Sequence, residues 1–236
     1  MMKPARAVPA ALHGLLAHDP WFASCPPDLQ QALVEAGRLQ PLDDGQPLFA
    51  RGGTAAGLCC VVAGALRVGS IDAQGEPALL AFIEPCQWFG EISMIDGLPR
   101  THDASADGDS EVLLVPEAAL AAWLAAHPAH WQDIARLACA KLRHAFEVLE
   151  DIQRLPLEQR LMKRLQLHAH GFGSRPPRRR LRLPQEQLAL MMGVSRQSVN
   201  KALRALEAQG LVALRYGGIE LLPAQNQAGA NLESPP

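Results

Sequence analysis

Five polar side chains stand within seven consecutive residues near the C-terminal end of the chain. They are Ser195, Arg196, Gln197, Ser198 and Lys201. Arginine, glutamine and lysine present hydrogen-bond donors that engage planar groups or phosphates, and serine hydroxyls engage single oxygens. These groups act together only if the local structure points them in one direction.

The surrounding sequence predicts such a structure, namely two short helices joined by a tight turn. Pro184 suits the start of a first helix that ends near Met192. Gly193 permits the turn, Ser195 is a favourable N-cap for the second helix, and Gly210 ends it. This arrangement is a helix-turn-helix, and an ordinary helical hairpin is the alternative.

The second helix has an apolar side and a polar side. Val199, Leu203 and Leu206 recur at helical spacing and predict the buried side, which leaves the polar side chains facing outward. Two apolar runs over residues 211–222 flank a Tyr-Gly-Gly turn and predict a hairpin wing beside the helices. A winged helix-turn-helix points to double-stranded DNA as a partner.

Charge divides the chain at the same point. Residues 158–223 carry 12 Lys and Arg against 4 Asp and Glu, a balance of +8, while residues 1–157 carry 10 against 19, a balance of −9. A basic module suits contact with phosphates, and an acidic neighbour limits nonspecific adhesion. The basic run over residues 175–182 is either part of this contact surface or a solvated loop.

The chain of 236 residues is long enough for two modest domains, and 48% hydrophobic residues suffice for two cores. No run reaches the length of a membrane span, and the N-terminus lacks the apolar core of a signal peptide, so we expect a cytoplasmic protein without membrane contact. Its five cysteines show neither CxxC spacing nor an even framework, which fits a reducing compartment.

Short apolar runs separated by glycines fill residues 45–116. They predict antiparallel strands closed into a β-roll or jelly roll. Short helices are expected on either side of the roll, over residues 27–39 and residues 117–126.

A long helix is predicted from residue 128 to a stop at Pro156. Its apolar stripe alternates steps of four and three and consists of Trp131, Ala135, Ala138, Leu142, Ala145, Leu149 and Ile152. This spacing is typical of a coiled coil and predicts pairing with the same helix of a second copy, whereas a helix that covers its own roll is the alternative. A homodimer suits a helix-turn-helix, because two recognition helices about one DNA turn apart read a palindrome.

The order of roll, long helix and winged helix-turn-helix resembles the Crp-Fnr superfamily of bacterial transcription regulators over nearly all of residues 21–223. The most specific segments are GVSRQSVNKALRALEAQGL and FGEISMIDGLPRT. The resemblance implies an α+β fold and three partners, which are DNA, a second copy and RNA polymerase. The chain then divides into a flexible segment over residues 1–20, a cyclic-nucleotide-binding-like sensor roll over 21–127, a dimerisation helix over 128–156, a DNA-binding domain over 157–223 and a disordered tail over 224–236.

The resemblance and the helix phase together put Arg196, Gln197 and Lys201 at the front of the recognition helix. There Arg196 would contact a guanine edge, Gln197 an adenine, and Lys201 a guanine or a phosphate. Ser195 and Ser198 would hold backbone phosphates and set the register.

The second segment is similar to the family's phosphate-binding cassette, in which a Gly-Glu pair opens a short helix and an arginine follows about nine residues later. The matching residues are Gly90, Glu91, Arg100 and Thr101. In relatives that bind cyclic nucleotides, the glutamate accepts the ribose hydroxyl and the arginine pairs with the phosphate. The resemblance therefore implies a small anionic effector at the roll, with a cyclic nucleotide as one candidate.

Four residues depart from that pattern and argue against cyclic AMP. His102 and Asp103 stand where small or β-branched residues are usual, and Asp103 would bring negative charge near a phosphate. Ala145 and Phe146 match the hydroxyl pair that contacts the purine from the long helix. A constitutive DNA-binding regulator with a degenerate sensor, whose cassette glutamate and arginine pair with each other, therefore stays open.

A redox or haem sensor is the other alternative within the family. Cys86 beside Trp88 would supply the thiol or haem ligand, while Cys59 and Cys60 are neighbours on a strand and point to opposite faces, which prevents chelation. A metal enzyme would need several histidines inside the roll, where the sequence has only His102. We therefore expect neither a metal site nor an enzyme.

Overall fold

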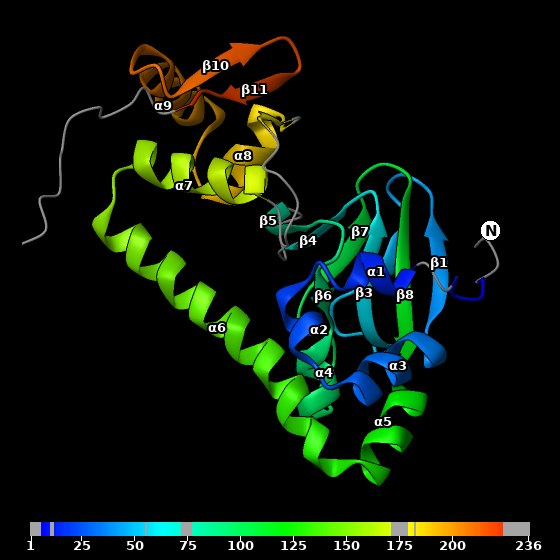
Figure 1. Cartoon of the computed structure of the whole chain (residues 1–236). Helices are drawn as coiled ribbons and strands as arrows, with labels where there is room; N and C mark the ends of the chain where they lie inside the picture. Colours follow the sequence, from blue (N-terminus) through cyan, green and yellow to red (C-terminus); the bar gives the residue numbers. More distant parts are fainter. Residues whose placement is uncertain are drawn as a thin grey trace, which may run out of the picture.

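The computed structural model describes residues 6–9, 12–54, 56–71, 77–170, 179–181 and 183–223. Figure 1 shows three parts in chain order, which are a roll of strands with short helices beside it, one long helix, and a small helical head with a hairpin. The predicted α+β class is confirmed. The predicted disordered tail, and most of the basic run over residues 175–182, lie outside the described residues.

Two four-stranded antiparallel sheets form the roll. The first has the order β1 (Arg38–Leu42), β8 (Ser110–Pro116), β3 (Gly57–Ala63) and β6 (Trp88–Phe89). The second has the order β2 (Pro47–Phe49), β7 (Asp103–Ala106), β4 (Leu66–Ile71) and β5 (Pro77–Ile83). The antiparallel roll predicted from glycine-punctuated apolar runs is confirmed.

Strand β3 is buried on both faces, which explains its continuous apolar run. Cys59 and Val61 lie in the core of the roll, whereas Leu58 and Cys60 pack toward the helices outside it. Successive side chains of a strand point to opposite faces. The two cysteines therefore face away from each other, as predicted.

Four short helices flank the roll, namely α1 (Leu12–Leu16), α2 (Pro20–Ser24), α3 (Pro27–Ala36) and α5 (Glu117–Ala126). Phe22 stacks on Trp88 with ring centres 5.5 Å apart, and Leu12 and Leu16 are buried in the same core. We expected residues 1–20 to be flexible, and for α1 this was wrong. Its two leucines lie one helical turn apart and are buried, and this burial stabilises the helix against the roll.

A 3-10 turn, η1 (Pro128–His130), leads into the long helix α6 (Trp131–Arg154). The helix has 24 residues, or roughly 36 Å at 1.5 Å per residue. Ile134 and Leu137 near its start are buried against the roll. None of the described helices is long and apolar enough to cross a membrane.

The head follows a bend at Pro156. It contains α7 (Leu157–His170), α8 (Gln185–Met192) and α9 (Arg196–Ala208), and a sheet in the order β10 (Val212–Arg215), β11 (Gly218–Leu221) and β9 (Arg180–Leu181). The predicted hairpin wing is β10 and β11. Helix α8 lies against β5 of the roll (Figure 1). The rings of Phe82 and His168 meet edge to face with their centres 6.1 Å apart.

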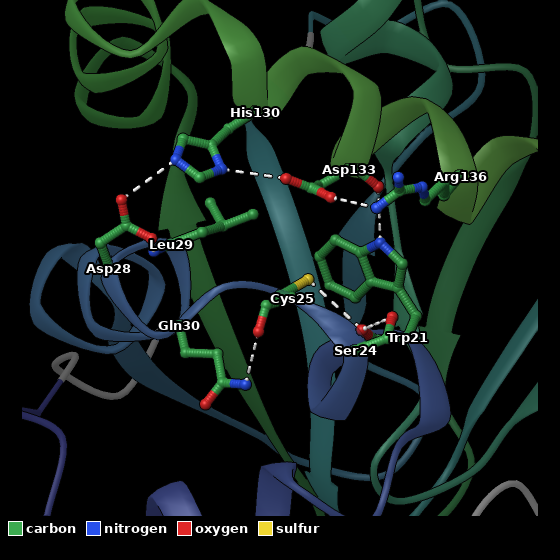
Figure 2. Close-up of polar contacts among 9 residues, drawn as sticks. All are labelled: Trp21, Ser24, Cys25, Asp28, Leu29, Gln30, His130, Asp133 and Arg136. Carbon is green, nitrogen blue, oxygen red and sulfur yellow. Dashed lines mark hydrogen bonds and ion pairs between the residues drawn. The ribbon is translucent and has the colours of Figure 1, made fainter.

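A histidine at the start of the long helix ties three helical segments together (Figure 2). His130 lies with Nδ1 2.9 Å from Asp133 Oδ2 and with Nε2 3.1 Å from Asp28 Oδ2 on α3. Arg136 donates to the other oxygen of Asp133 at 2.6 Å, and Trp21 Nε1 donates to the Asp133 carbonyl at 2.7 Å. Because both ring nitrogens face carboxylates, the contact is complete only when the imidazole is protonated.

This contact makes stability depend on pH in a defined direction. The hydrogen bond to Asp133, assisted by Asp28, raises the pKa of His130 above its ordinary value. The stabilisation is therefore fully present below the unfolded pKa of about 6.5 and is lost as the pH rises through the higher folded pKa. We expect His130→Gln to cost about 1.5 kcal/mol at pH 6 and almost nothing at pH 9.

Thermal unfolding of wild type and variant at both pH values checks this expectation. His144→Gln, on an exposed part of the same helix, is the control and should shift stability little at either pH. A His130→Gln cost that is equal at pH 6 and pH 9 would show that the ring acts through packing alone.

Candidate functional site

The sequence caps both helices of the helix-turn-helix. Ser195 Oγ accepts a hydrogen bond from the backbone N–H of Ser198 at 3.1 Å, which starts α9. Gly193 has a φ of +62° and ends α8. Gly210, with a φ of +70°, follows the C-cap of α9, so the predicted start, turn and end are all confirmed.

The inner side of α9 fixes its position in the head. Val199, Leu203 and Leu206 are buried, and they share one core with Leu161 of α7 and Leu188 of α8. Their spacing of four and three keeps them on one side of the helix. The opposite side therefore points outward from a rigid support.

The outward side carries the three side chains predicted to read DNA. Arg196, Gln197 and Lys201 are exposed, and none makes a hydrogen bond or ion pair with any residue that the structure describes. Ser195 and Ser198 differ, because their hydroxyls lie 2.9 Å from each other. The three longer side chains can thus bind a partner without first breaking an internal contact.

Two other polar residues of α9 serve the head itself. Asn200 Nδ2 donates to Gln185 Oε1 on α8 at 3.0 Å, and its Oδ1 accepts from Arg204 Nε at 3.1 Å. These contacts brace α9 against α8. Asn200 and Arg204 are polar residues like those on the outward side of α9. The sequence alone therefore did not distinguish residues that support the head from residues that are available to DNA.

The wing adds basic groups that were not among the predicted site residues. Tyr216 is fully exposed at the tip of the hairpin, next to Arg215, which pairs with Glu220 at 3.2 Å. Arg180 on the neighbouring strand β9 is also exposed, and its Nη2 lies 3.5 Å from the Tyr216 carbonyl. The basic run over residues 175–182 indicated a contact surface in the sequence. The pairing of strand β9 with the wing was needed to show that Arg180 lies there.

The cassette in the roll has the predicted local form. Gly90, with a φ of +98°, precedes α4 (Glu91–Asp96), so a Gly-Glu pair does open a short helix. A Cβ at Gly90 would lie 2.7 Å from Arg100 Nη1 and 2.8 Å from the Gly57 carbonyl. Glycine is therefore required both for the backbone angle and for the close approach of the arginine.

Arg100 is buried beneath the start of this helix, with 4% of its surface exposed. Its Nη2 donates to the Gly57 carbonyl at 2.7 Å, and its Nη1 donates to the Gly90 carbonyl at 3.1 Å. The guanidinium carbon lies 4.4 Å from the centre of the Phe49 ring. Its Nε is buried without a hydrogen-bond partner among the described residues, so the two carbonyls do not use all of its donors.

Glu91 is 1% exposed and pairs with the long helix rather than with Arg100. Its Oε2 accepts a hydrogen bond from Lys141 Nζ on α6 at 2.7 Å. The alternative in which Glu91 and Arg100 pair with each other is therefore wrong. Lys141 lies 50 positions away in the sequence, which is why local spacing did not reveal it.

The remaining cassette residues lie at its outer edge. Thr101 is exposed, and its Oγ1 lies 2.9 Å from His102 Nδ1. Asp103 starts β7, and its carboxylate accepts the backbone N–H of Arg51 at 2.8 Å. The carboxylate of Asp103 is thus bound by the backbone of the loop at Arg51.

Two of the cysteines in the roll, Cys59 and Cys60, are poorly suited to redox sensing. Burial raises the pKa of Cys59 to about 12 and that of Cys60 well above its ordinary value, which suppresses the reactive thiolate. Cys86 is buried with a φ of +74°, and its Sγ lies 3.2 Å from the Leu15 carbonyl. Within the described parts of the chain, no group of three or more His, Cys, Asp or Glu residues could hold a metal ion.

Two family models match the two ends of this architecture. Residues 39–127 match the cyclic nucleotide-binding domain, and residues 159–225 match the Crp-like helix-turn-helix domain. The chain belongs to the Crp-Fnr family of transcription regulators, and it is not an enzyme.

Individual relatives agree with this assignment. The chain is 30% identical over 205 residues to the CRP-like cAMP-activated global transcriptional regulator of Mycobacterium tuberculosis, covering 85% of this chain and 91% of the relative. It is 30% identical over 188 residues to the cyclic AMP receptor protein of Thermus thermophilus, covering 79% and 84%. FixK2 of Bradyrhizobium japonicum has the same fold, with a TM-score of 0.70 at 20% identity over 80% of this chain and 94% of FixK2.

Proposed function

We propose that this chain is a cytoplasmic homodimer that binds a palindromic DNA operator through Arg196, Gln197 and Lys201 and regulates transcription by RNA polymerase. The observation that carries the proposal is the outward side of α9, where three side chains with several donors are exposed and make no hydrogen bond or ion pair with a described residue. Arginine and glutamine in this position match guanine and adenine edges in the major groove.

The exposed apolar side of the long helix supports dimerisation. Leu142, Phe146, Leu149 and Ile152 are each more than half exposed, at 54%, 57%, 54% and 54%. A contiguous apolar stripe of this kind is typical of a surface that another chain covers. The spacing of these residues fits pairing with an identical helix.

The seam is shorter than the predicted stripe. Trp131 at the start of α6 packs against the core of the roll, so this end of the helix covers its own domain. The start of the helix thus fits the alternative in which it covers its own roll, and the exposed second half supports the proposed pairing. Phe146, which was not part of the predicted stripe, is exposed beside Leu142 and Leu149 and extends the apolar side of the helix.

Selection of bound sequences from random DNA tests the proposal. We expect an inverted repeat whose half-sites have centres about 10 base pairs apart, or a multiple of that spacing. Recovery of a single unrepeated site, or of no preferred sequence, would contradict a symmetric dimer that reads DNA.

The cassette favours a second candidate function, that of a regulator that binds DNA constitutively, without an effector. Two relatives are named for activation by or reception of cyclic AMP. In this chain, however, the groups expected to bind such a ligand are engaged, Glu91 by Lys141 and Arg100 by two carbonyls. A cyclic nucleotide would compete with these contacts for both side chains, and Ala145 and Phe146 offer the purine no hydroxyl.

We therefore expect cyclic AMP to change operator affinity by less than about fivefold, the lower end of usual allosteric coupling. Titration of cyclic AMP and cyclic GMP against operator affinity measures this change in wild type, Arg100→Ala and the control Arg143→Ala. Strong activation that is present in wild type and the control but lost in Arg100→Ala would show that a ligand does displace the carbonyls.

A further inference from the structure

A cavity of about 440 Å³ lies where the long helix meets the head, away from the cassette. Its walls come from the second half of α6, from α7 and from α8. Figure 1 shows α6 and α7 meeting at a bend. The volume falls within the range of small-molecule sites.

The cavity wall carries three carboxylates and three Lys or Arg side chains, but these do not all pair with one another. Asp151 pairs with Lys163 at 2.6 Å, Glu150 pairs with Arg154 outside the cavity at 3.8 Å, and Glu147 Oε2 lies 3.5 Å from His144 Nδ1. The remaining cations are Arg160 and Arg164, which stand one turn apart on α7.

Neither of these two arginines has a carboxylate within ion-pair distance among the residues that the structure describes. Both are partly buried, and Arg160 Nε is shielded from solvent without a hydrogen-bond acceptor. Desolvation lowers the pKa of Arg164. Two adjacent guanidinium groups in this state suit a phosphate, sulfonate or carboxylate, which they bind through paired hydrogen bonds.

The rest of the wall is apolar. Val148, Leu167, Met191 and Met192 line the cavity beside the arginines. Methionine side chains adapt to irregular apolar partners, including aromatic rings. We propose that this cavity is a binding site for an amphipathic anion, a small molecule with an acidic group and a flat apolar body.

Dimerisation leaves most of this site open. At 100° per residue, His144, Glu147 and Asp151 lie on the side of α6 opposite to Leu142 and Leu149. Ile152 belongs to the exposed seam and also lines the cavity, so a second copy that packs on the seam reaches one edge of the site.

The location gives the site a regulatory consequence, which rests on the proposed DNA-binding function. Leu155 and Pro156 form the only covalent link between the long helix and the head. A ligand that touches α6, α7 and α8 together would favour one angle between them. It would thereby change the spacing of the two recognition helices in a dimer.

Two fluorescent dyes test the site on the full chain without DNA. Anilinonaphthalene sulfonate carries the acidic group and the flat apolar body, and phenylnaphthylamine has a similar body without the charge. We expect Arg160→Gln with Arg164→Gln to raise the Kd of the sulfonate at least tenfold and that of the neutral dye less than twofold. Arg38→Gln with Arg143→Gln removes the same charge elsewhere and should change neither value.

A second variant tests the site independently of any folding defect in the Arg160→Gln, Arg164→Gln variant. Leu167→Trp fills the cavity and should weaken binding of both dyes, with unfolding curves confirming that each variant is folded. Equal sulfonate binding in wild type and the Arg160→Gln, Arg164→Gln variant would overturn the proposal. A second result would also overturn it, namely that the wild type binds no sulfonate and that the Arg160→Gln, Arg164→Gln variant loses the dimer. A carboxylate of the second copy would then occupy the site.

The DNA step is measured separately. At saturation, the sulfonate should shift operator affinity at least threefold in wild type and not in the Arg160→Gln, Arg164→Gln variant. An operator affinity unchanged by a bound dye would overturn the regulatory consequence. Because dye binding is measured without DNA, failure of the site and failure of the DNA-binding proposal are distinguishable.

Discussion

Replacing Leu142 and Leu149 together by glutamate should convert the dimer into monomers. Each leucine is exposed in the single chain, and burying one in a dimer seam contributes about 1.5–3 kcal/mol. The double variant removes four such contributions per dimer and adds four like charges along one seam. Sedimentation velocity should show a single species of half the wild-type mass.

The control adds the same charge away from the seam. Gln132→Glu with Ala140→Glu changes two exposed positions on other sides of the same helix and should leave the dimer intact. An intact dimer in the Leu142→Glu, Leu149→Glu variant would mean that α6 does not form the interface.

Replacing Arg196 by alanine should weaken operator binding by about 1–3 kcal/mol per half-site, or about 2–6 kcal/mol for a symmetric dimer. The physical reason is the loss of a forked donor that engages both acceptors of a guanine edge. Its guanidinium is exposed and makes no polar contact within the part of the chain that the structure describes, so the loss should not disturb the head itself.

Competition with operators altered at single base pairs distinguishes a base contact of Arg196 from a phosphate contact as the cause of the weaker binding. A base contact predicts that preference relaxes at one position in each half-site. Uniform weakening on every sequence would make Arg196 a phosphate contact instead. Arg204→Ala is the matched control, because Arg204 is bound to Asn200 and should cost little beyond that contact.

The helix-turn-helix could be predicted from sequence because its determinants are local. Ser195 caps the backbone three residues ahead of it, and Gly193 supplies the left-handed turn within the same segment. The apolar spacing of Val199 and Leu203 then fixes which side is buried. The antiparallel roll was predictable for a similar reason, since glycine-bounded apolar runs mark its strands.

The contacts of the effector cassette could not be predicted, because they join distant parts of the chain. Lys141 reaches Glu91 across 50 positions, and Arg100 reaches the Gly57 carbonyl across 43. A family motif identifies Glu91 and Arg100 but does not reveal that other groups already engage them. The division of α6 into a buried half and an exposed half likewise depends on where the roll ends.

The central claim is that two copies of α9, held by the paired long helices, read two half-sites at a fixed distance. The most direct measurement compares affinity for the selected operator with affinity for the same operator carrying five extra base pairs between its half-sites. Half a turn of DNA puts the second half-site on the opposite side of the duplex, so we expect affinity to fall at least a hundredfold, toward that of one half-site. Equal affinity for both operators would contradict the claim, because it would mean that each head binds DNA independently of its partner.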